Sequence, residues 1–177
     1  GAAGTITGLG NEAVTLTDAI TVPQANAINA LTTGVVTATI ATTAIIDLDD
    51  LTGTGNAYTI IIGDANATAA QLNTVNAATT VDVNASAVTT ITGTAADLIT
   101  VYAATGTIDG LGNEAVTITD TSINASALIT LDGFTSGIIN ASSITTLTGS
   151  ASDQATVRAS SGITGLPGSI ALNSITL

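Results

Sequence analysis

The chain has 177 residues and carries one basic residue, Arg158, against 13 acidic residues, which gives a formal net charge of −12. With 45% hydrophobic and only 8% charged residues it is too apolar for a disordered acidic tail, so we expect it to fold around a core. The sequence contains no His, Cys or Lys, which excludes Ser-His-Asp, Cys-His and Schiff-base catalysis within the chain, and a single Arg excludes binding to nucleic acid through phosphate contacts.

Short runs of β-branched residues predict strands along the whole chain. They lie at Val14–Thr17, Val35–Ile40, Tyr58–Ile62, Val81–Val83, Val116–Thr119, Ile138–Ile139 and Ile170–Leu172. Most of them are followed at once by an Asx residue, namely Asp18, Asp64, Asn84, Asp120, Asn140 and Asn173. Because Asp and Asn side chains can bond the backbone two residues on, this recurring position predicts a stacked ladder of Asx-turns.

The segments between these strands carry helix signals. The sequence VPQANAINAL places Pro23 in a first helical turn, and TAAD at 94–97 and SASD at 150–153 match a capping box. Further helices are predicted over Thr43–Leu51, Ala67–Asn76 and Asn124–Leu131.

The chain repeats itself. Residues 4–18, GTITGLGNEAVTLTD, recur at 106–120 as GTIDGLGNEAVTITD with 13 of 15 residues identical. Equivalent glycines at Gly8, Gly53, Gly110 and Gly165 divide the chain into repeat units. We therefore expect a single domain over 1–177 that contains units at 8–52, 53–109 and 110–164 and a partial unit at 165–177.

Strands that alternate with short helices in a fixed order predict parallel pairing between neighbouring repeats. The expected fold is an α/β solenoid with parallel strands and short helices, similar in spacing to leucine-rich repeats. The alternative is a right-handed parallel β-helix, in which the linking segments are further strands and turns. In either fold the aliphatic side chains fill a narrow core, which agrees with the 2% aromatic content.

The strings TGLGNEAVTLTDA, LTGTGNAYTI and VNASAVTTITGTAAD resemble the Ala/Thr/Gly/Asn-rich tandem repeats of giant secreted or cell-surface proteins of marine cyanobacteria and other bacteria. Such proteins include adhesins, surface-layer components and haemolysin-type calcium-binding exoproteins. The resemblance implies an extracellular or cell-surface structural role, and it implies calcium. The strings GTGNAY and GLGNEA, however, lack the paired glycines and following Asp of the calcium-binding nonapeptide GGxGxDx.

Two groups of carboxylates are candidates for a metal site, since calcium prefers six to eight oxygen ligands. Asp47, Asp49 and Asp50 form an acidic run, whose alternative interpretation is the solvated face of a short helix. Asp18, Asp64 and Asp120 occupy matching positions of the repeat and are expected along one edge, with about one carboxylate for each turn of the chain. We therefore expect no obligatory cofactor and at most weak calcium binding at the surface.

Taken together, the sequence predicts a structural repeat segment of an extracellular bacterial protein, such as a spacer, stalk, sheath or adhesin shaft, and not an enzyme. Its expected partners are copies of itself or adjacent repeats, with contact to a cell surface or glycan, and no apolar run is long enough for a membrane span. One alternative is ice binding by Thr-x-Thr pairs at Thr15/Thr17, Thr37/Thr39 and Thr117/Thr119. A weaker alternative is a carbohydrate-active or glycan-binding solenoid, which the scarcity of aromatic residues disfavours.

Overall fold

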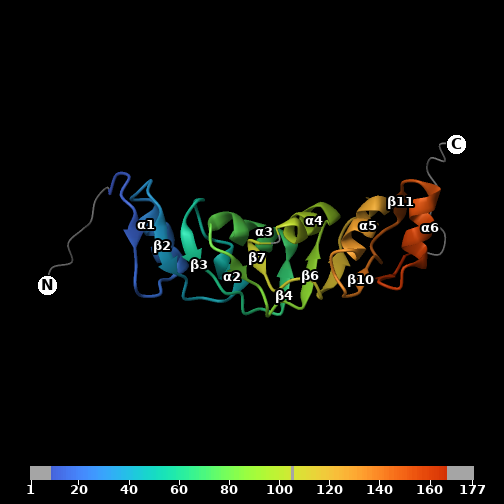
Figure 1. Ribbon diagram of the computed structural model, residues 1–177, viewed down its shortest axis with the longest axis horizontal. Coiled ribbons are helices and arrows are strands. Elements are labelled where there is room, and N and C mark those ends of the chain that lie inside the picture. The colour runs from blue at the N-terminus through green and yellow to red at the C-terminus, as the bar shows by residue number, and fades with distance from the viewer. Residues whose placement is uncertain (1–8, 105, 167–177) are drawn as a thin grey trace.

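The computed structural model describes residues 9–104 and 106–166. Parallel strands and short helices alternate along the chain and follow one another in a row from the N-terminal to the C-terminal end (Figure 1). The α/β class, the parallel strands and the short helices that the sequence predicts are thereby confirmed.

Each helix begins within two residues of the start that the sequence predicts, although the residue before α2, Ala44, makes no side-chain cap. Their bounds are α1 Val22–Asn29, α2 Ile45–Leu48, α3 Ala69–Ala78, α4 Ala95–Ala103, α5 Ala125–Asp132 and α6 Ala151–Ala159. Thr21 and Thr68 form reciprocal capping boxes with Gln24 and Gln71, so that each pair satisfies backbone N–H groups of the first helical turn. Every helix predicted from the sequence is therefore present, although α2 is shorter than the predicted Thr43–Leu51.

The described part of the chain contains more strands than the sequence predicts. Their bounds are β1 Val14–Thr15, β2 Val36–Thr39, β3 Ala57–Thr59, β4 Asn66–Thr68, β5 Val83–Asn84, β6 Thr90–Gly93, β7 Ile108–Asp109, β8 Ala115–Ile118, β9 Ser122–Asn124, β10 Ile139–Asn140, β11 Thr146–Thr148 and β12 Ile163–Thr164. Strands β4 and β9 end on the N-cap residues Thr68 and Asn124, because an N-cap residue is itself extended, and so overlap the first residues of the predicted helices Ala67–Asn76 and Asn124–Leu131. The predicted strand Ile170–Leu172 and its Asn173 lie outside the described residues.

All strand pairs are parallel, and the partners lie 20 to 25 residues apart in the sequence, as Thr37 opposite Ala57 and Ile91 opposite Val116 illustrate. The longest sheet has the order β12-β10-β8-β6-β4, and a second sheet has the order β1-β2-β3. A helix together with the strand or strands between it and the preceding helix is here called a strand–helix segment and is named after its helix. The α5 segment, for example, contains β7, β8, β9 and α5. The α2 to α5 segments therefore pair with the segment before and the segment after, whereas within the described residues the α1 segment pairs only with the α2 segment.

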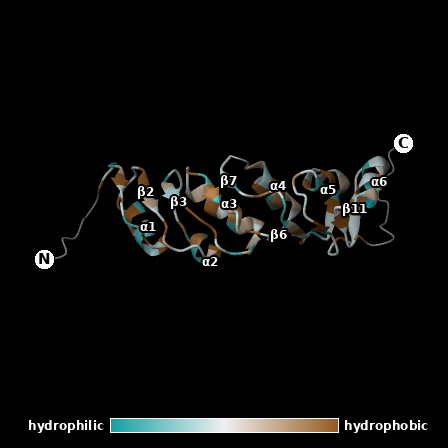
Figure 2. Cartoon of the chain, turned by 60° about the horizontal axis from the view of Figure 1, so that its bottom comes forward, coloured by the Kyte–Doolittle hydropathy of each residue, from teal (hydrophilic) through white to brown (hydrophobic). Residues whose placement is uncertain are grey.

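The hydrophobic core runs through all of these segments as one cluster. Leu72, Leu98 and Leu128 of three successive helices are fully buried, as are Ile91 and Ile139 of the sheet. Figure 2 shows hydrophobic residues in strands and helices along the whole length of the chain. The core is thus long and narrow, and each segment contributes only a few side chains to it.

A buried threonine fixes the start of three segments. The hydroxyl groups of Thr32, Thr79 and Thr135 donate to backbone carbonyls of the preceding segment at 2.6, 2.7 and 2.8 Å. Each hydroxyl also accepts from the backbone N–H two residues on. Both hydrogen-bonding functions of a buried hydroxyl are used, so this contact sets the register between segments without leaving a polar group unsatisfied.

Candidate functional site

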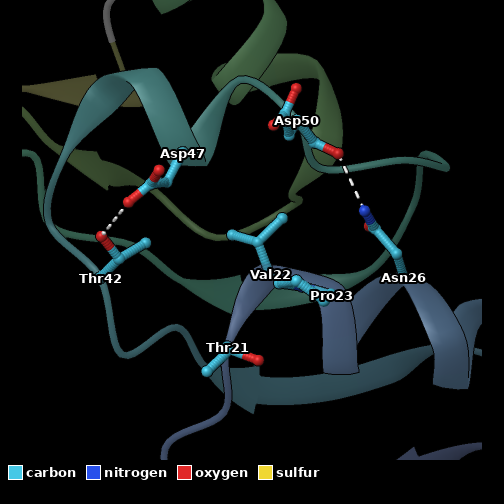
Figure 3. A pocket seen from close by; sticks show the side chains of 7 residues that line it. All are labelled: Thr21, Val22, Pro23, Asn26, Thr42, Asp47 and Asp50. Atoms are coloured by element: carbon cyan, nitrogen blue, oxygen red, sulfur yellow. Dashed lines mark hydrogen bonds between the residues drawn. The ribbon is translucent and has the colours of Figure 1, made fainter.

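A surface hollow lies between α1 and α2 (Figure 3). Its volume is about 640 Å³, and its walls are formed by Thr21, Val22, Pro23, Asn26, Thr42, Asp47 and Asp50. Val22 and Pro23 give it an apolar side, whereas the two carboxylates stand on α2 and the loop that follows it. It is the place in the structure where the predicted acidic run meets a concave surface.

The acidic run does not converge on a point in this hollow. The Asp47 carboxylate accepts a hydrogen bond from the Thr42 hydroxyl at 3.1 Å, on the far side of the hollow from Asp50 (Figure 3). Asp50 contributes its backbone carbonyl to the Asn26 side-chain amide at 2.9 Å, and Asp49 caps the end of α2. Asn26 also accepts from the backbone N–H of Thr52 at 2.8 Å. These bonds join α1 to the end of the α2 segment, which is a structural use of the residues.

The repeated aspartates also have structural partners. The Asp64 carboxylate accepts from the backbone N–H of Ile45 at 2.6 Å, and that of Asp120 accepts from the backbone N–H of Ala95 at 2.7 Å. Both donors are the first residues of helices in the preceding segment. A carboxylate from the following segment therefore caps the helix before it, where the helix dipole favours a negative charge. Asp18, in the first described segment, is exposed.

The prediction of Asx-turns is correct for Asn84 and Asn140 and wrong for Asp64 and Asp120. Asn84 and Asn140 accept from the backbone N–H groups of Ser86 and Ser142, each at 3.1 Å, as an Asx-turn requires. Asp64 and Asp120 instead reach across to the neighbouring segment, because a helix start with an open N–H lies beside each carboxylate.

A buried polar cluster that the sequence analysis did not single out lies between α4 and β8. Glu114 is fully buried and accepts from the Tyr102 hydroxyl at 3.1 Å and from the backbone N–H of Gly112 at 2.8 Å. The Tyr102 ring stacks on Phe134 with ring centroids 5.7 Å apart. Burial, and then the neighbouring Glu114 charge, raise the pKa of Tyr102 far above its ordinary value, so the phenol stays neutral and donates.

In an earlier segment, the position that corresponds to Glu114 is occupied by Tyr58. Thr79 donates to its carbonyl as Thr135 does to that of Glu114, and both Tyr58 and Glu114 are fully buried. The Tyr58 hydroxyl, however, has no hydrogen-bond partner among the described residues. Burial raises the pKa of Tyr58 as well.

Among residues 9–104 and 106–166, no three acidic side chains come close enough to hold a metal ion together. Asp18, Asp64 and Asp120 therefore do not form a shared site in the structure, and neither do Asp47, Asp49 and Asp50. Within the same ranges, no helix has the length and apolar character that crossing a bilayer requires.

Comparison of the chain with protein-family models, curated proteins and solved structures finds no match.

The carboxylate caps between segments can be tested by truncation. We expect Asp120→Ala to lower the free energy of unfolding by about 1 kcal/mol, because the N–H of Ala95 loses its acceptor at a helix start. The matched control is Asp18→Ala at the equivalent, exposed position, where we expect a change within about 0.5 kcal/mol. Urea unfolding of the two variants measures both values, and equal effects would contradict the capping role.

The two buried tyrosines should respond in opposite directions to loss of the hydroxyl. Tyr102→Phe leaves Glu114 without its side-chain donor, so we expect stability to fall by about 1–3 kcal/mol. Tyr58→Phe removes a buried hydroxyl that has no partner in the described part of the chain, so we expect no loss of stability or a gain of up to about 1 kcal/mol. Losses of the same size in both variants would refute this assignment.

The same tyrosines should make the fold sensitive to alkali. Their pKa values are raised in the folded state, so stability is intact below the ordinary tyrosine pKa of about 10 and falls as pH rises above it. The slope is at most about 1.4 kcal/mol per pH unit for each tyrosine. With no Lys or Cys in the chain, the double variant Tyr58→Phe/Tyr102→Phe should be flat between pH 10 and 12, and a persisting slope would show that other groups cause it.

Proposed function

We propose that the chain is a segment of an α/β solenoid whose role is to hold a fixed distance, as a spacer, stalk, sheath or adhesin shaft does. One observation carries this proposal: the same contacts between successive segments recur along the chain. Buried threonines donate to the preceding segment at Thr32, Thr79 and Thr135, and aspartate caps recur at Asp64 and Asp120. A structure built from one repeated contact lengthens with each added unit while its cross-section stays the same.

The proposal includes the repeat units 8–52, 53–109, 110–164 and 165–177 within one domain. It also includes an extracellular or cell-surface location, supported by the resemblance of the repeats to giant bacterial surface proteins. A net charge of −12 makes neighbouring copies repel each other laterally, and weak calcium binding would relieve that repulsion. Adjacent repeats are then the main partners, and a cell surface or glycan is the second.

Ice binding is kept as a second candidate because of one arrangement on the sheet β1-β2-β3. Thr15 lies opposite Thr37, Thr39 lies opposite Thr59, and all four side chains are exposed. Such rows of hydroxyl and methyl groups support the ordering of water, but Ala57 interrupts the row of Thr37. Thermal hysteresis of the protein in solution would separate this candidate from a spacer, which produces none.

A seamless duplication tests the spacer directly. Because residues 4–18 and 106–120 are equivalent, a chain of residues 1–105 followed by 4–177 inserts the α1 to α4 segments a second time in register. We expect small-angle X-ray scattering to show a maximum dimension longer by about 20 Å, from four added segments at about 4.8 Å each. The cross-sectional radius of gyration should stay unchanged.

The single chain of 177 residues is the reference for this measurement. A duplicated chain whose cross-section grows in place of its length, or which behaves as two independent domains on a flexible tether, would contradict the spacer function.

A further inference from the structure

We propose that the exposed edge formed by β1, Glu12 and Asp18 is a docking surface for one more strand–helix segment of the α4 type, namely a strand followed by a Thr-capped helix that carries a tyrosine near its end. This inference rests on the proposed solenoid and adds to it the identity of the partner at one end.

The first support is that residues 9–18 repeat a segment whose neighbours on both sides are known. The two copies, 4–18 and 106–120, share 13 of 15 residues. On their C-terminal sides they make the same contacts. Thr32 donates to the Glu12 carbonyl and Thr135 to the Glu114 carbonyl, and backbone N–H groups of the following segments reach Gly10 and Gly112.

The second support is the set of contacts that the later copy, residues 106–120, makes with the α4 segment on its N-terminal side. Strand β6 pairs with β8, the Asp120 carboxylate caps Ala95 at the start of α4, and the Tyr102 hydroxyl donates to Glu114. These three contacts specify one partner: a strand, then a helix with an open first N–H, then a phenol about two turns further on. Position by position, the earlier copy offers the same acceptors as Asp18 and Glu12.

The third support is a difference in burial between the two copies. Glu114, Val116 and Ile118 lie in or beside β8, which pairs with β6 of the α4 segment, and are 0%, 1% and 0% exposed. Their equivalents are exposed at Glu12 and half-buried at Val14 and Leu16. The same side chains that complete a core at β8 therefore stand at β1 on a strand that, within the described residues, has one side unpaired, and such an edge is a template for pairing.

The occupant is predicted in detail. If the docked segment repeats the register of β6 on β8, its Thr-Ile-Thr-Gly strand lies opposite residues 13–16. The first N–H group of its helix then donates to the Asp18 carboxylate, and its tyrosine hydroxyl donates to the Glu12 carboxylate. A helix N-terminus and a neutral phenol are both suited to a carboxylate acceptor. The charge and hydrogen-bonding pattern of the edge thus match a further repeat of this same kind.

The duplicated chain of residues 1–105 followed by 4–177 supplies that occupant, since its internal copy of residues 9–18 follows an α4 segment. We expect Asp18→Ala in the internal copy to lower Tm by about 2–4 °C, the same effect that we expect for Asp120→Ala. Glu12→Ala in the internal copy should lower Tm by at least as much. The same substitutions in the terminal copy of the same chain are the matched controls, and we expect them to change Tm by less than about 1 °C.

Substitutions that are equally silent in both copies, while X-ray scattering still shows the lengthened particle, would overturn this inference and leave the spacer function standing. A particle that does not lengthen would overturn the spacer function itself. Self-association of the 177-residue chain in sedimentation velocity that Asp18→Ala and Glu12→Ala abolish would assign the edge to a second copy, and so overturn the assignment to a preceding segment.

Discussion

Parallel pairing between successive strand–helix segments is the interaction on which the rest of this structure depends. A segment of this size cannot bury an apolar face by itself, because only a few aliphatic side chains, such as Leu98 with Ile91 in the α4 segment, belong to it. Contact with the segment before and the segment after removes those side chains from water. The stability of each segment therefore depends on contact with its neighbours. Because the space between segments is narrow, aliphatic side chains fill it and few aromatic residues are needed.

The polar contacts between segments give this packing its register. A buried hydroxyl such as that of Thr135 allows one alignment, since it must both donate to the preceding segment and accept from its own. The Asp120 carboxylate at the start of α4 and the Glu114 carboxylate under Tyr102 add two further constraints at one junction. A chain that has almost no basic residue thus uses helix ends, backbone N–H groups and a phenol to satisfy its carboxylates.

Local signals in the sequence were sufficient to predict the helices, but they were not sufficient to predict the burial and the hydrogen-bond partners of the acidic residues. Capping residues such as Thr94 and Ser150 predict helix starts because the signal lies within four residues. Strands β4 and β9 were missed because they are only three residues long and end on an N-cap residue. The burial of Glu114 could not be predicted, since Glu12 has nearly the same flanking sequence and is exposed. What differs is the neighbouring segment, and that information lies outside the repeated string.

The central claim, that each segment is held by its neighbours, is tested most directly by native-state hydrogen exchange resolved to single amides. If stability passes from segment to segment, protection should be greatest in the middle, at β6, β8 and α4, and should fall toward α1 at one end and α6 at the other. Uniform protection across the six helices that the structure describes, with one opening free energy for them all, would contradict the account.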